Sequence, residues 1–133
     1  MATLKTNTLT GTSTAGSIAV TGEGNSTTTN LQQGLAKNWS QVQGTDTFTL
    51  NDSFNVSRLT DETTGTYKIN FTNSFANATY CGAGMHNRTS NGICCVGEDP
   101  TRGFGTGFAT MRCTLDNALT DPSSCRFMFV GDS

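Results

Sequence analysis

The sequence contains little charge, and no charge of one sign is gathered into a patch. Only 14% of the 133 residues are charged, and eight Lys and Arg against ten Asp and Glu give a formal net charge of −2. The basic residues are scattered singly, so they form no continuous surface for a phosphate backbone. We therefore expect no nucleic-acid partner.

Long apolar runs are also missing. No stretch approaches the roughly 18 apolar residues that a membrane-spanning helix requires. The first ten residues, MATLKTNTLT, contain no apolar stretch of the length found in signal peptides. The sequence predicts no membrane insertion and a protein that is made and assembled in a cytoplasm.

Histidine is scarce, and the cysteines lack the spacing of metal or redox motifs. There is one histidine, His86, and the five cysteines contain no CxxC pair: Cys81, Cys94, Cys95, Cys113 and Cys125. A metal cluster built from them with His86 would need a tetrahedral arrangement of ligands. The alternative, which we favour, is that these cysteines are small buried hydrophobic residues on strands, so we expect no metal and no cofactor. Because five is an odd number, at least one remains unpaired within a monomer.

Catalytic motifs are absent as well. His86 is not accompanied by a GxSxG serine or an HExxH helix. The acidic pairs that could serve a glycosidase or a calcium site lie in turn-like sequence, where they have structural explanations: Asp61 with Glu62, Glu98 with Asp99, and Asp116 with Asp121. We therefore expect a protein that is not an enzyme.

The abundant residues favour short strands and tight turns. The chain contains 25 Thr, 15 Gly, 12 Asn and 11 Ser. Threonine is β-branched and prefers extended backbone, whereas Gly and Asn supply the positive φ angles of turns. We predict a mainly β protein in three parts: an N-terminal attachment segment (1–30), a short helical neck (31–43) and a C-terminal antiparallel β-sandwich head (44–133).

The head shows an alternation of period two. Phe48 with Leu50 and Phe54 with Val56 each share one face, and a turn at 61–65 precedes a strand with Tyr67, Ile69 and Phe71 on one face. Further strands are predicted at about 78–86, 92–97, 104–114 and 124–131. The last of these is apolar on both faces, which predicts that its second face meets another subunit.

The first 30 residues have too few large apolar side chains to bury a core. Residues 1–22 predict two short strands, broken at Gly11 and Gly16, with Ile18 and Val20 on one face, and residues 22–29 predict a polar loop. A lone hairpin is marginally stable in water. We expect this segment to dock on other proteins or pair between chains.

A helical spacing follows. Leu31, Leu35, Trp39 and Val42 recur at intervals of 4, 4 and 3, which predicts one apolar face of a helix. A helix of this length, with Gly34 inside it, is not stable alone. Its stripe could lie against its own head domain, or copies from several chains could meet as an oligomer interface, which is the arrangement we favour.

Three stretches resemble one known family. They are LKTNTLTGTSTAGSIAVTGEGNSTTTNLQQGLAKNW, DSFNVSRLTDETTGTYKINFTNSFANATY and RFMFVGDS, about 70 of the 133 residues. They are similar to segments of small tail-fibre-like virion structural proteins of marine tailed bacteriophages. The resemblance implies a homotrimer located in the virion, an N-terminal segment bound to other virion proteins of tail or capsid, and a head that faces the host surface.

Two predicted loops carry candidate receptor-binding side chains: His86, Asn87, Arg88, Arg102 and Phe104. Such side chains could hydrogen-bond or stack on a host surface glycan or protein, although solvated turns have the same composition. The expected function is host-surface attachment by non-catalytic binding. The alternatives are a capsid decoration or head fibre protein, and a glycan-hydrolysing tip.

Overall fold

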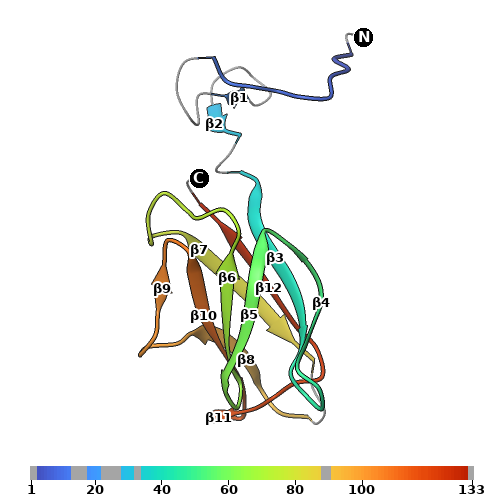
Figure 1. Ribbon diagram of the computed structural model, residues 1–133, viewed down its shortest axis with the longest axis vertical. Coiled ribbons are helices and arrows are strands. Elements are labelled where there is room, and N and C mark those ends of the chain that lie inside the picture. Colours follow the sequence, from blue (N-terminus) through green and yellow to red (C-terminus); the bar gives the residue numbers. More distant parts are fainter. Residues whose placement is uncertain (1–2, 13–17, 22–27, 32–33, 88–90, 132–133) are drawn as a thin grey trace.

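The chain folds into a β-sandwich-like head with an N-terminal segment that projects from one end (Figure 1). The computed structural model describes residues 3–12, 18–21, 28–31, 34–87 and 91–131. Within these residues the regular structure consists of strands, and all their pairings are antiparallel. The mainly β prediction is therefore confirmed.

One layer is a four-stranded sheet with the order β4-β3-β12-β7. Its strands are β3 (Ala36–Gln43), β4 (Thr49–Phe54), β7 (Cys81–His86) and β12 (Cys125–Val130). The last strand in the sequence, β12, therefore lies in the middle of the sheet and joins β3 to β7.

The other layer is a six-stranded sheet centred on β10 (Phe108–Leu115). One edge of β10 pairs with β6 (Thr66–Phe71) and β11 (Ala118–Leu119), and β5 (Val56–Thr63) pairs with β6. Two more short strands pair with β10 off this path: β8 (Cys94–Glu98) and β9 (Phe104–Gly105).

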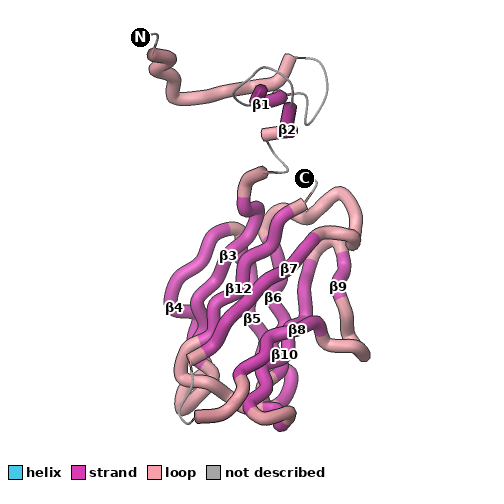
Figure 2. The backbone as a smooth tube through the Cα atoms, turned by 180° about the vertical axis from the view of Figure 1, so that it is seen from behind, coloured by secondary structure: helices cyan, strands magenta, loops and turns pink. Residues whose placement is uncertain are grey.

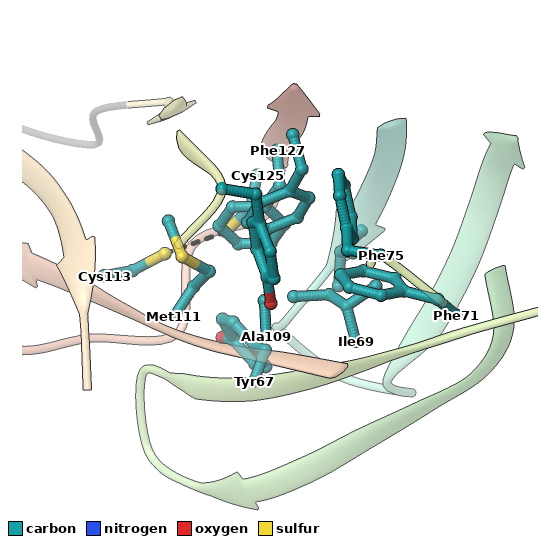
Figure 3. Close-up of a cluster of buried hydrophobic side chains, with 12 residues drawn as sticks. Tyr67, Ile69, Phe71, Phe75, Ala109, Met111, Cys113, Cys125 and Phe127 are labelled. Carbon is teal, nitrogen blue, oxygen red and sulfur yellow. Dashed lines mark hydrogen bonds between the residues drawn. The ribbon is translucent and has the colours of Figure 1, made fainter. Parts of the chain in front are cut away.

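The core fills the space between the two sheets (Figure 3). Alternate residues of β6, β10 and β12 point into it, as period-two side-chain orientation requires: Tyr67, Ile69 and Phe71; Ala109, Met111 and Cys113; Cys125, Phe127 and Phe129. The connection between β6 and β7 adds Phe75 and Tyr80, whose rings stack with centroids 4.0 Å apart. The alternation predicted for 67–71 is thus confirmed.

The strand that was expected to carry both Phe54 and Val56 is divided between the two sheets. Asn55 has a φ of 60°, a left-handed conformation that Asn tolerates better than most residues. The chain leaves the four-stranded sheet at Phe54 and enters the six-stranded sheet at Val56. Val56 packs against the core, whereas Phe54 is 53% exposed, so the prediction of one shared face is wrong.

The predicted helix over residues 31–43 is also wrong, because residues 36–43 form β3. The inward face of this strand consists of Asn38, Ser40 and Val42, all buried. The Asn38 amide donates a hydrogen bond of 2.9 Å to the Asn55 carbonyl oxygen, which offsets part of the cost of burying it. A strand whose buried positions are partly polar has no apolar period of two, and the apolar spacing alone resembled a helix.

The N-terminal hairpin is present but lies later in the sequence than predicted. β1 (Ala19–Thr21) pairs with β2 (Thr28–Asn30), which falls in and beyond the expected polar loop. No strand occurs in residues 3–12, the described part of the predicted first strand. Val20 remains 51% exposed, so this hairpin buries little apolar surface of its own.

Candidate binding surfaces

A row of apolar side chains crosses the outer face of the four-stranded sheet. The strand register places Phe54 of β4 opposite Trp39 of β3, Trp39 opposite Met128 of β12, and Met128 opposite Ala83 of β7. Cross-strand partners share a face of a sheet. Because the residues beside Trp39 and Met128 point into the core, these four side chains point outward. We call them the apolar row.

Large side chains in and beside this row are well exposed. The exposed fractions are 53% for Phe54, 39% for Trp39, 46% for Met128 and 64% for Met85, which lies on β7 next to the row. Leu35 is 56% exposed and lines a shallow pocket of about 300 Å³ together with Phe54. Contiguous exposed apolar surface of this kind marks interaction sites on soluble proteins.

A second row on the same face is mainly polar. The register places Asp52 opposite Gln41, Gln41 opposite Arg126, and Arg126 opposite Met85. It therefore presents one carboxylate, one amide and one guanidinium beside the apolar row. The face combines an apolar centre with polar groups of both signs, as the contact surfaces of protein complexes do.

A groove of about 420 Å³ runs over β12 between Trp39 and Met85. It exists because β7 has small residues here. Ala83 contributes only a methyl group to the outer face, and a Cβ at the inward Gly84 would lie 2.6 Å from Val96 Cγ1 of the opposite sheet. Gly84 thus lets β7 lie close against β8, and the outer surface is hollowed above it.

The four residues of the predicted oligomer stripe do not share a face. Val42 is fully buried in the core of its own chain. Trp39 lies on the opposite, outward face of the same strand, and Leu35 precedes that strand and is exposed. Leu31 is half-buried, and its N–H donates to the Ile18 carbonyl oxygen at 2.8 Å. Only Leu35 and Trp39 thus contribute to the exposed apolar surface around the row.

His86 and Asn87 lie at the end of the sandwich opposite the N-terminal segment. The His86 Nδ1 and Nε2 atoms lie 2.9 Å from the carbonyl oxygens of Asn87 and Thr114, so the ring bridges the two sheets. The Asn87 amide donates to Ser123 Oγ and accepts from the Ser124 N–H. Both side chains hold this end together, while Arg88 lies outside the described residues.

Arg102 belongs to an ion-pair network on the outer side of the six-stranded sheet. Its Nε lies 3.4 Å from Glu62 Oε2, and its Nη1 lies 3.7 Å from Oδ2 of the fully buried Asp99. The Nε of Arg112 lies 2.7 Å from the same Asp99 oxygen. These contacts occupy Arg102 within its own domain.

The Asp99 carboxylate is the centre of this network. Burial alone would raise its pKa, but hydrogen bonds from the Arg102 and Thr101 N–H groups and the charges of Arg112 and Arg102 outweigh that effect. The net result is a pKa below the usual value. In the Glu98–Asp99 pair considered above, Asp99 therefore anchors the loop between β8 and β9.

Phe104 packs inside the domain. Its ring stacks on Tyr80 with centroids 5.1 Å apart and meets Phe129 edge-on at 5.8 Å. The four predicted receptor-binding residues that the structure describes are not gathered together either. His86 contacts β10 at Thr114, whereas the loop of Arg102 pairs with Thr110, four residues or about 13 Å away along the strand.

Two further properties concern metals and membranes. Within the described residues, no group of three or more His, Cys, Asp or Glu side chains is arranged to hold a metal ion. The same part of the chain contains no helix with the length and apolar character needed to span a membrane.

The chain matches no protein-family model, no curated protein and no solved structure.

Proposed function

We propose that this chain is a bacteriophage virion structural protein, a short tail-fibre-like homotrimer that contributes to host-surface attachment by non-catalytic binding. The observation that carries the proposal is the apolar row, an exposed surface on an otherwise well-packed sandwich. The resemblance of the N-terminal, central and C-terminal stretches to tail-fibre-like proteins supports the same proposal.

The arrangement of the chain suits a protein that bridges two partners. The N-terminal segment projects from the end of the sandwich where β3 begins and β12 ends (Figures 1 and 2). The β3–β4 and β5–β6 connections lie at the opposite end. In the proposed fibre, the N-terminal segment binds other proteins of the particle, and the opposite end faces the host.

The outer face of the four-stranded sheet is the proposed contact between the three copies. Around a threefold axis, the central strands β3 and β12 would place Trp39 and Met128 nearest to one another. Each large side chain is already about half-buried in one chain, so burying the rest contributes roughly 1 kcal/mol per residue. Asp52 and Arg126 on the same face can form ion pairs between copies.

Trimerisation would give weak receptor contacts a useful combined affinity. Three heads held at a fixed spacing convert the second and third binding events into intramolecular ones. An attachment protein of this kind needs neither a deep pocket nor a catalytic group in each head. In each of the three heads, the end of the sandwich furthest from the N-terminal segment then contacts the host.

The direct test is the molar mass by light scattering at micromolar concentration. We expect three chain masses for the wild type and one for Met128→Asp, because three buried carboxylates near the axis would repel and lose solvation. The matched control is Ile93→Asp, since Ile93 is 72% exposed and lies away from the apolar row; it should remain trimeric. A monomeric wild type would overturn the proposed trimer.

The position on the particle is tested separately by antibody labelling of phage virions. Label at the tail supports the attachment protein. Label over the capsid would refute it in favour of a decoration or head fibre protein attached through the N-terminal segment.

A further inference from the structure

Two cysteine side chains meet in the middle of the core. Cys113 lies on β10 of the six-stranded sheet, and Cys125 lies on β12 of the four-stranded sheet. Their Sγ atoms are 3.2 Å apart, and both residues are fully buried (Figure 3). This contact joins the two sheets directly across the core.

We propose that Cys113 and Cys125 are a site of oxidative modification, at which an intersheet disulfide forms when the protein meets a disulfide oxidant. A disulfide bond is about 2.05 Å long, so the two sulfur atoms need to approach by a little over 1 Å from their reduced positions. The other cysteines of the chain are exposed or half-buried: Cys81, Cys94 and Cys95. The pair therefore differs from the rest in its complete burial.

The oxidation balances with a glutathione disulfide as the oxidant. One cysteine loses its proton, and its thiolate attacks the glutathione disulfide, which forms a mixed disulfide and releases one glutathione thiolate. The second cysteine thiolate then attacks the protein sulfur of that mixed disulfide and releases the second glutathione thiolate. The two protons lost by the cysteines end on the two glutathione thiols, so two electrons pass from protein to oxidant.

The same burial controls when the bond forms. The hydrogen bond with Cys113 and the desolvation in the core raise the pKa of Cys125. Thiolate, the reactive form, is thus strongly disfavoured in the folded sandwich, and glutathione cannot reach the pair. Oxidation is expected while the sheets are open, during folding or transient unfolding, and to be very slow in the closed reduced protein.

The crosslink should stabilise the sandwich. It closes a loop that begins in β10, includes β11 and ends in β12, with a separation of 12 residues between the cysteines. Crosslinking a loop of this length lowers the conformational entropy of the unfolded chain. For a chain of this size, the resulting stabilisation raises the melting temperature by roughly 10 °C.

The test is refolding of the full chain from denaturant in a glutathione redox buffer, compared with refolding in reductant. We expect the oxidised wild type to lose two hydrogen atoms in intact mass, to yield a Cys113–Cys125 linked peptide after digestion, and to melt at a higher temperature. Cys81→Ala should behave identically, because Cys81 lies outside the core pair. Cys113→Ala should show neither the mass change nor the temperature shift.

The peptide map of the wild type tests for the Cys113–Cys125 disulfide even if the Cys113→Ala variant does not fold. Refolded wild type in which Cys113 and Cys125 both remain as free thiols, or in which either is linked to Cys81, Cys94 or Cys95, would overturn the proposal. None of these outcomes depends on trimerisation or on receptor binding.

Discussion

Replacing Gly65 with alanine tests how tightly the β5–β6 hairpin is held against the rest of the sandwich. Gly65 has a φ of 65°, and a Cβ there would lie 2.6 Å from the Cys113 carbonyl oxygen and 2.7 Å from the Thr120 backbone nitrogen and oxygen. These are backbone atoms, so no rotamer change can relieve the overlap. The Gly65 N–H also donates to Asp121 Oδ1 at 2.6 Å, and its carbonyl accepts from the Cys113 N–H at 2.7 Å.

The expected loss follows from these contacts. A left-handed alanine costs about 1–2 kcal/mol. Moving the turn away to make room weakens two hydrogen bonds, one of them to a carboxylate, at about 1–3 kcal/mol each. Since these terms overlap, we expect Gly65→Ala to lower the free energy of unfolding by about 3–5 kcal/mol. That is a large share of the roughly 5–15 kcal/mol typical of a whole domain.

The assay is urea unfolding followed by the fluorescence of Trp39, the only tryptophan of the chain. The control is Gly97→Ala on β8, because a Cβ at Gly97 meets no atom within 4 Å. We expect Gly97→Ala to change stability by about 0.5 kcal/mol or less. Equal unfolding midpoints for the two variants would refute the reasoning about the packed turn.

Three further predictions concern the core and its polar contacts. Phe129→Ala and Phe127→Ala should each lower the free energy of unfolding in urea by about 3–5 kcal/mol, because both rings are buried in the core. Met128→Ala, on the opposite face of the same strand, should lower it much less. Tyr67→Phe should cost about 1.5–3 kcal/mol by thermal unfolding, because it removes the hydrogen bond of 2.8 Å from the buried phenol to Asp121; a cost below about 0.5 kcal/mol would refute this. The lowered pKa of Asp99 means that its ionised form stabilises the fold above an unfolded pKa of about 4, and that this stability is lost as the pH falls through the lower folded pKa. Urea midpoints measured from about pH 7 down to about pH 3 should therefore fall less steeply for Asp99→Asn than for the wild type, and parallel curves would contradict the assignment.

The strands with apolar inward positions could be predicted from the sequence. Tyr67, Ile69 and Phe71 alternate with polar residues in β6, and β12 likewise shows its buried residues at every second position. The period-two pattern is reliable when one face of a strand is buried and apolar. Its physical cause, burial against a facing sheet, operates in both strands.

β3 could not be predicted in this way, because Asn38 and Ser40 occupy two of its buried positions. Burial of polar side chains depends on partners distant in sequence, such as the Asn55 carbonyl oxygen that accepts from Asn38. The sequence alone does not show that Asn38 and Asn55 are hydrogen-bonded. The remaining apolar residues then matched a helical spacing by coincidence.

The apolar row was equally hidden from the sequence. Its members come from four strands, and only the register between strands aligns Phe54, Trp39, Met128 and Ala83. The sequence did indicate that the outward face of the last strand is unusually apolar. Of the predicted loop residues, Arg102 forms ion pairs within its own domain and Phe104 packs against the core. Neither the partners of Arg102 nor the burial of Phe104 could be inferred from local composition.

The central position of β12 has a consequence for how the chain folds. Until residues 125–130 are available, β3 and β7 have no strand between them, and the inner face of the four-stranded sheet cannot form. Folding must therefore wait for contacts between distant parts of the chain, which makes it slow. A chain cut short before β12 would expose unpaired strand edges and be lost to aggregation. Formation of the four-stranded sheet therefore depends on the last strand of the sequence to be synthesised, because β3 and β7 are joined only through β12.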